Sequence, residues 1–170
     1  FFSLAVIVAA LGYFVDIYDL LLFTIVREPS LLGIQVSDVD MLSVSTKIIN
    51  WQMMGLLIGG IVWGIMGDKK GRLSVLFGSI LLYSVANFIT GYVQTVEQYA
   101  WLRFIAGIGL AGELGAGITL VSELMPKKNR GVMTSFVAGV GLFGAVFAYI
   151  IYKVTGDWRL CYKIGGVLGI

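Results

Sequence analysis

The sequence has no histidine, a single cysteine and few charged side chains. Because histidine and cysteine are the commonest transition-metal ligands, and disulfides need cysteine pairs, metal centres and disulfide bridges are excluded. We expect Cys161 to be a small packing residue. Charged residues make up 13% of the chain and hydrophobic residues 58%, whereas a soluble domain carries roughly 25% charged residues. The expected solvent is therefore a lipid bilayer.

Other classes of protein are disfavoured by what is missing. The near-neutral balance of +2 argues against nucleic-acid binding, for which a clustered basic face is expected. No nucleophile–base pair or metal-ligand set is visible, so we expect neither enzyme activity nor a cofactor. Residues 1–15 resemble a secretory signal in hydrophobicity, but they lack a basic front and a small-residue cleavage site. Apolar residues also resume beyond Asp19, which favours a spanning helix.

Charge-poor runs predict five membrane-spanning helices and the start of a sixth. A spanning helix needs about 20 predominantly apolar residues. Open strands would leave backbone groups unsatisfied in lipid, and a barrel would show alternating segments of about ten residues. The expected fold class is therefore an all-α integral membrane protein. Its predicted spans cover residues 4–26, 48–67, 73–93, 99–124, 132–152 and 158 onward.

The distribution of lysine and arginine predicts the orientation. Residues 67–72 and residues 125–131 each contain three of them, more than the loops expected on the opposite side. Cytoplasmic loops carry an excess of Lys and Arg, so these turns and the N-terminus should be cytoplasmic, in the cell membrane. Residues 27–47 would form one long outward loop. Since the chain starts without Met and stops in an apolar run at Ile170, we expect a piece of a longer protein.

Four charged residues lie inside the predicted spans: Asp16 and Asp19 in the first, Arg103 and Glu113 in the fourth. A charge at mid-bilayer is costly, so such residues face a bundle interior or a water-filled cavity. At 1.5 Å per residue, Asp19 lies ~10 Å and Arg103 ~6 Å from the outer surface, which makes an ion pair plausible. Glu113 lies ~15 Å further in and has no obvious partner.

These charges allow more than one interpretation. The Asp19–Arg103 pair is either a static stabiliser or a proton-dependent lock that opens when the aspartate is protonated. Asp16 is a candidate substrate contact for an amine or hydroxyl group, and Glu113 either faces the same cavity or bonds to neighbouring backbone.

Polar residues at the outer end of the second span are further candidates. Asn50 and Gln52 are candidate substrate contacts. Trp51 is either a further substrate contact or an anchor at the membrane interface.

Glycines recur at spacings of two to four within the predicted second and fourth spans. Such spacing lets helix backbones approach closely in lipid, either as fixed packing or as sliding surfaces. If three-helix units repeat with inverted topology, the first and fourth spans are counterparts, and transporter sites cluster at such interfaces. The glycines are Gly55, Gly59, Gly60, Gly64, Gly107, Gly109, Gly112 and Gly115.

A short charged turn, residues 64–72 (the hinge), separates the second and third spans. It resembles the loop motif of the major facilitator superfamily, Gly-x-x-x-Asp-(Arg/Lys)-x-Gly-(Arg/Lys). The matching residues are Gly64, Asp68, Lys69, Gly71 and Arg72.

The buried charges extend this resemblance. Residues 103–116 are similar to the Arg-x-x-x-Gly-x-x-x-Gly-Gly-Glu pattern of the metabolite:proton symporter branch, with Ala111 in place of one glycine. Residues 12–19 resemble its first-helix Gly-x-x-x-Glu-Trp-(Tyr/Phe)-Asp pattern, with Asp16 for glutamate and Ile17 for tryptophan. Tyr18 in this motif joins the substrate-cavity candidates. Glu123 with Pro126 and Arg130-Gly131 resembles the end of helix four in that branch and in the sugar porters.

The resemblance implies twelve helices in two six-helix halves. Residues 1–170 would be most of the N-terminal half, incomplete at its sixth helix, with the C-terminal half as its partner. The implied function is secondary transport by alternating access, as proton symport of a small polar or anionic metabolite. The alternative is a receptor, scaffold or assembly protein on the same bundle.

The resemblance also assigns a cytoplasmic gate. Asp68 would cap a helix of the other half, and Gly64 would permit its close approach. Arg72, Glu123 and Arg130 would form a charge network that breaks as the protein opens inward. Lys69 belongs to the motif, but topology control is the simpler role for it and for Lys70, Lys127 and Lys128.

Overall fold

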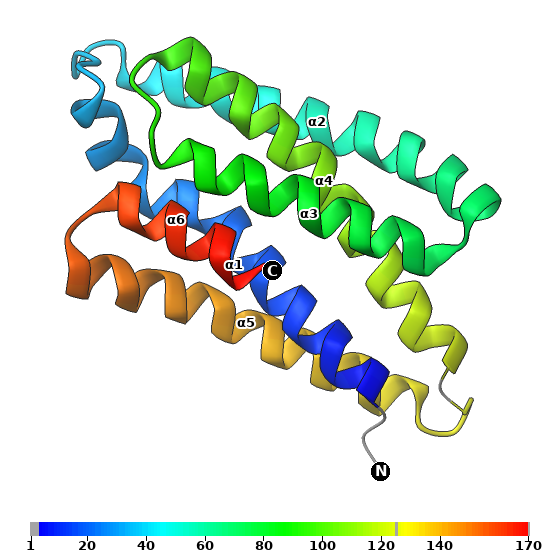
Figure 1. The fold of residues 1–170 in the computed structure, drawn as a ribbon. Coiled ribbons are helices and arrows are strands. Elements are labelled where there is room, and N and C mark those ends of the chain that lie inside the picture. The colour runs from blue at the N-terminus through cyan, green and yellow to red at the C-terminus, as the bar shows by residue number, and fades with distance from the viewer. Residues whose placement is uncertain (1–3, 125, 170) are drawn as a thin grey trace.

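The computed structural model describes residues 4–124 and 126–169, and its ordered elements are all helices (Figure 1). No strand occurs in these two ranges, so the predicted all-α fold is confirmed. The elements are α1 (Leu4–Gly33), α2 (Met41–Lys70), α3 (Arg72–Thr90), α4 (Val96–Leu124), α5 (Arg130–Thr155) and α6 (Trp158–Leu168).

The long loop expected at residues 27–47 is wrong. Helix α1 continues through Arg27, Glu28 and Pro29 to Gly33, and α2 already begins at Met41. Charged residues at a membrane surface end the apolar run, but they do not end the backbone hydrogen bonding that defines a helix. The connection is therefore residues 34–40, where Gln35 adopts a positive φ of 65°.

The connections alternate between two ends of the bundle (Figure 1). The hinge end holds the α2–α3 and α4–α5 turns and the start of α1, and the far end holds the other three connections. Gly71 alone separates α2 from α3, with φ 86°, a conformation open to glycine without strain. The predicted tight turn is thus confirmed.

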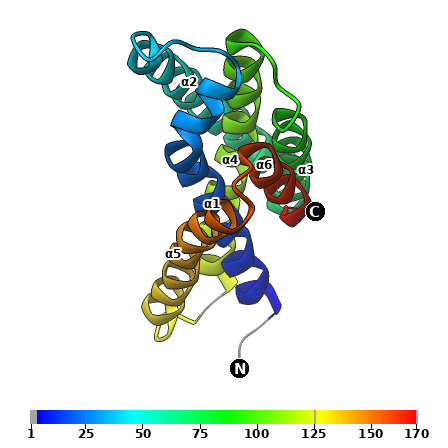
Figure 2. The same cartoon turned by 90° about the vertical axis from the view of Figure 1, so that its left-hand side faces the viewer.

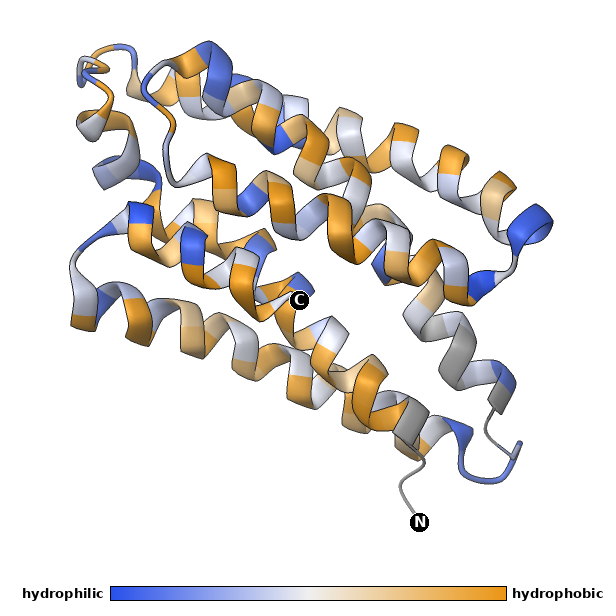
Figure 3. Ribbon diagram, in the orientation of Figure 1, coloured by the Kyte–Doolittle hydropathy of each residue, from blue (hydrophilic) through white to orange (hydrophobic). Residues whose placement is uncertain are grey.

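The helices are built for lipid on the outside. Four of them, α1, α2, α3 and α5, are long and apolar enough to cross a membrane. Figure 3 shows hydrophilic residues gathered mainly at the turns and hydrophobic residues along the helix faces. Helix α4 packs against α1, α2 and α3, and two of its charged residues, Arg103 and Glu113, are buried in the bundle.

The packing follows an inverted repeat. Helix α1 lies along α5, and α4 lies along α2, so α1 and α4 occupy equivalent places in two three-helix units (Figures 1 and 2). The third helices of the units, α3 and α6, pack on each other. The expectation that the charged first and fourth spans are counterparts agrees with this arrangement.

The glycines divide into two groups. The glycines of one group lie where two helix backbones touch, as expected for fixed packing. The other group has nothing within 4 Å of the position a Cβ would take, and so leaves open surface. The touching glycines are Gly55, Gly59 and Gly107 between α2 and α4, and Gly109 between α4 and α3; the open ones are Gly60, Gly64 and Gly115. Gly112 instead packs against the side chains of Ser79 and Trp63.

Close packing between α5 and α1 gives a first test. A Cβ on buried Gly144 would press on the carbonyl of Phe14 and the amide nitrogen of Tyr18, whereas a Cβ on Gly139 of the same helix meets nothing within 4 Å. We expect Gly144→Ala to destabilise the full-length protein by about 1–3 kcal/mol, the usual cost of overpacking. Thermal unfolding in detergent, with Gly139→Ala as the matched control, measures it; equal melting temperatures would contradict the packing described.

Candidate functional site

The two charges predicted to pair are in contact. Arg103 Nη1 donates to both carboxylate oxygens of Asp19 at 3.2 Å, and both side chains are completely buried. The pair joins α1 to α4, the counterpart helices of the two units. Removing two charges from water costs several kcal/mol for each ion, which mutual attraction offsets only when further hydrogen bonds complete the site.

The remaining partners of Arg103 come from α3 and α6. Its Nη2 donates to the side-chain oxygen of buried Asn87, and its guanidinium carbon lies 4.9 Å from the ring centre of Tyr162. The Tyr162 hydroxyl is 2.6 Å from that of Tyr99, which also reaches Ser30. Four helices therefore meet at one guanidinium.

Sequence reasoning missed these neutral partners. Asn87 is the one amide side chain in the charge-free predicted span 73–93, a signal of the same kind as a buried charge. Tyr162 gave no signal, because aromatic residues are ordinary in spanning helices. Only the fold brings its ring to the guanidinium of Arg103.

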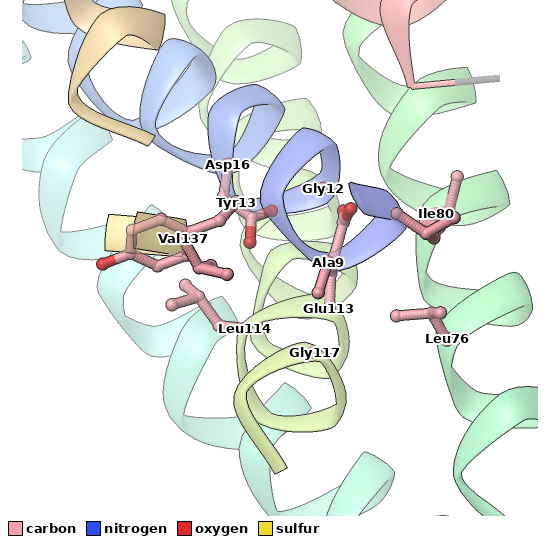
Figure 4. Close-up of a pocket in the computed structure, with 11 residues that line it drawn as sticks. Ala9, Gly12, Tyr13, Asp16, Leu76, Ile80, Glu113, Leu114, Gly117 and Val137 are labelled. Atoms are coloured by element: carbon pink, nitrogen blue, oxygen red, sulfur yellow. The ribbon is translucent and has the colours of Figure 1, made fainter. Parts of the chain in front are cut away.

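The structure brings together two candidates that the sequence left apart. Asp16 and Glu113 are 1% and 4% exposed and lie between α1 and α4 (Figure 4). Their carboxyl groups are within hydrogen-bonding reach of each other. Glu113 therefore turns to Asp16 and not to backbone, the alternative considered above. Asp16 Oδ1 and Glu113 Oε2, one buried oxygen of each group, have no hydrogen-bond partner among the described residues.

The structure places Tyr18, one of the substrate-cavity candidates, in the packed interior between helices. Its hydroxyl donates to the carbonyl oxygen of Cys161 at 2.8 Å, and its side chain is fully buried. The ring also packs against Phe147. It lies on the side of α1 that meets α5 and α6, where it holds helices together. Buried Cys161 is the packing residue that was expected.

The outer candidates on α2 are not brought to one site. Asn50 is exposed, whereas Gln52 is buried with its Nε2 unpaired among the described residues. Residues two apart on a helix point to opposite sides, which explains the difference. The ring of Trp51 packs at a tilt against that of Trp101, with ring centres 4.8 Å apart, and this contact joins α2 to α4.

At the hinge end, Arg72 and Glu123 form an ion pair of 3.0 Å between α3 and α4. Both side chains are about half exposed, at 43% and 53%, so the pair contributes at most about 1 kcal/mol. Arg130 is exposed at the start of α5 and forms no ion pair with the residues described. The predicted contact between Arg72 and Glu123 is present, and the third member stands apart.

A groove of about 300 Å³ lies next to this ion pair, between α2, α3 and α4. Asp68 and Arg72 contribute its charges. Gly60, Gly64 and Gly115 contribute open, side-chain-free walls. Such a surface admits another backbone at short range.

Inverted three-helix units whose first helices face each other are a typical architecture of secondary transporters. The family model of the Major Facilitator Superfamily matches residues 2–170. The chain belongs to this superfamily.

Two relatives and one solved structure are similar to this chain. A Haemophilus influenzae protein described as a metabolite transporter is 32% identical over 164 residues, covering 95% of this chain and 39% of that protein. The niacin transporter NiaP of Acinetobacter baylyi is 32% identical over 127 residues, 72% of this chain and 29% of NiaP. The inward-open xylose transporter XylE from E. coli has the same fold, with a TM-score of 0.83 at 20% identity, covering 96% of this chain and 44% of XylE. The chain thus spans less than half of each.

The buried pair should contribute far more to stability than the exposed one. Arg103→Leu leaves Asp19 charged and unpaired in the core, so we expect a loss of about 3–5 kcal/mol, and the same for Asp19→Leu. The double variant should recover part of this loss because it leaves no lone charge. Thermal unfolding of the full-length protein measures the cycle.

The exposed pair supplies the control for that cycle. In the matching set of Arg72→Gln, Glu123→Gln and their double variant, we expect a coupling below about 1 kcal/mol. Similar coupling energies for the two pairs would contradict the burial described.

Proposed function

We propose that the full-length protein is a secondary active transporter of the cell membrane, working by alternating access. It carries a small polar or anionic metabolite together with protons, and its N-terminus is cytoplasmic. The observation that supports this most strongly is the fully buried Asp19–Arg103 pair between counterpart helices. Membership of the superfamily supports the transport itself.

The pair is suited to couple a proton to helix movement. A proton on Asp19 removes its charge and most of its attraction for Arg103. Arg103 keeps Asn87 and the Tyr162 ring, neither of which depends on the state of Asp19. Arg103 therefore keeps these two partners in the core while the tie between α1 and α4 weakens. A proton can shift a conformational equilibrium only through such a difference between states.

The names of the relatives support a small acid or anion as the metabolite. They include transporters of niacin, benzoate and 4-hydroxybenzoate, which are aromatic acids, and of inorganic phosphate. Arg103 is enclosed by its partners and is not free to bind such an anion. We infer that the positive contact for an anionic substrate comes from the other half, while exposed Asn50 is available for a first contact on this one.

The groove at the hinge end supports the gate assignment. We infer that a helix of the C-terminal half packs against the open faces of Gly60 and Gly64, with its positive N-terminal end at Asp68. The half-exposed Arg72–Glu123 pair is weak enough to break in each transport cycle. For Lys69, at the end of α2, we keep topology control as the assigned role.

The competing function is a non-transporting receptor, scaffold or assembly protein. In that case Asp19 and Arg103 would be static stabilisers, and changing them would affect folding alone. The neighbouring amide Asn87 permits a variant that separates the two functions.

Exchanging the acid and the amide is the sharpest test of the coupling. The double variant Asp19→Asn with Asn87→Asp keeps the charge, size and number of groups around Arg103 but moves the carboxylate from α1 to α3. We expect Asp19→Asn alone to abolish accumulation and to lower stability, and the double variant to recover stability without accumulation. Proteoliposomes under an imposed pH gradient, tested with niacin, benzoate and phosphate, measure uptake.

Two outcomes would contradict the proposal. Full accumulation by the stable double variant would show that the position of the carboxylate does not matter. No uptake of any compound by the unmodified protein, with Asp19→Asn changing stability only, would favour the non-transporting class.

A further inference from the structure

The Asp16–Glu113 pair lies outside the coupling scheme described so far. It is buried between the same two helices, α1 and α4, one helical turn from Asp19 toward the hinge end. We propose that these two carboxyl groups hold one proton between them and form a second proton-binding site. The inference deepens the proposed transport function, because such a site gives a transporter a second place for a proton.

The surroundings of the pair favour an uncharged hydrogen bond over two free charges. The cavity beside the carboxyl groups is lined mainly by aliphatic side chains (Figure 4), and one oxygen of each carboxyl has no hydrogen-bond partner among the described residues. Two ionised carboxylates at this range would repel strongly in a site enclosed mainly by apolar side chains. One shared proton turns the repulsion into a hydrogen bond. The aliphatic lining residues include Val8, Ala9, Leu76, Ile80, Leu114 and Val137.

The size of the cavity limits what can bind beside the two carboxyl groups. Its volume is about 20 Å³, room for roughly one water molecule. An organic ammonium group does not fit in that space. A hard metal cation would need about six oxygen ligands, and the described residues contain no group of three or more acidic, histidine or cysteine side chains. A proton fits between the two carboxyl groups and needs no further ligand.

Gly12 makes the contact possible. The Oε1 atom of Glu113 lies 2.7 Å from the position that a Cβ on residue 12 would occupy. Any side chain there would displace the glutamate from Asp16, which is one turn further along α1. Gly12, Asp16 and Glu113 are therefore one structural unit, which gives a physical reason for the first-helix glycine that precedes the acid by four residues.

Other titratable groups face the pair from α1 and α3. Asp19 adds a negative charge from the same helix, which favours a proton on the pair, and Arg103 offsets that charge. Tyr83 of α3 is also nearby, and its hydroxyl donates to the carbonyl of Val15. Tyr13 lines the cavity, and α5 contributes uncharged Val137. A change at Asp19 is therefore felt at the second site.

Infrared difference spectroscopy of the full-length protein in lipid tests the proposal without any substrate. A shared proton gives a carboxylic C=O band in the unmodified protein. In Asp16→Asn or Glu113→Gln, the amide N–H donates to the remaining carboxylate and takes the place of the proton. We expect either variant alone to abolish the band while keeping the melting temperature. Glu123→Gln, the matched control, removes a half-exposed carboxyl group of α4 and should retain the band.

Gly12→Ala provides a second route that leaves both acids in place. We expect it to shift the band toward the frequency of an acid without a hydrogen bond, because the glutamate is pushed away. A band that survives in either amide variant, or that is unchanged in Gly12→Ala, would overturn the shared proton. Since the band is measured without substrate, failure here is distinct from failure to transport.

Discussion

A single guanidinium buried in a membrane protein is the constraint on which the rest of this structure depends. Arg103 has no access to water, so every helix around it must supply something: α1 the counter-charge of Asp19, α3 the amide of Asn87, α6 the ring of Tyr162. The partners differ in one respect that matters for function. Only Asp19 can lose its charge, and only Asp19 lies on the counterpart helix of the other three-helix unit. The costliest residue in the core is thus also the one whose surroundings a proton can change.

The same logic organises the surface between α1 and α4. Two levels of charge lie along it, the ion pair nearer the far end and the Asp16–Glu113 pair nearer the hinge end, and both are enclosed. Each is satisfied in a different way: the first by opposite charge, the second, we propose, by a shared proton. At the hinge end the interactions are exposed and weak instead of enclosed. The Arg72–Glu123 pair is half exposed and weak, and the adjoining glycines offer no side chains. Strong interactions lie in the core and weak ones at the surface where the other half is expected to move.

Much of this could be predicted from the sequence, because a bilayer imposes simple rules. The lengths of the apolar runs predicted the helices. The similar depths of Asp19 and Arg103 along their helices predicted the ion pair. Residues 27–47 were misjudged because hydropathy marks the edge of the lipid and not the end of a helix. The orientation of Tyr18, the meeting of Asp16 with Glu113, and the roles of Asn87 and Tyr162 depend on how α1, α3, α4 and α6 rotate against one another. That rotation is set by close backbone contacts at particular glycines, and glycine spacing alone does not say which ones touch.

The central claim is that a proton on Asp19 accompanies the transport cycle. Proton uptake on substrate binding, followed with a pH indicator in weakly buffered, purified full-length protein, measures it most directly. Once a transported compound is identified, we expect its addition to draw protons from solution in the unmodified protein. The uptake should be absent in Asp19→Asn and in the stable Asp19→Asn, Asn87→Asp double variant. The same uptake in all three proteins would contradict a coupling role for Asp19 and leave the buried pair as a static brace.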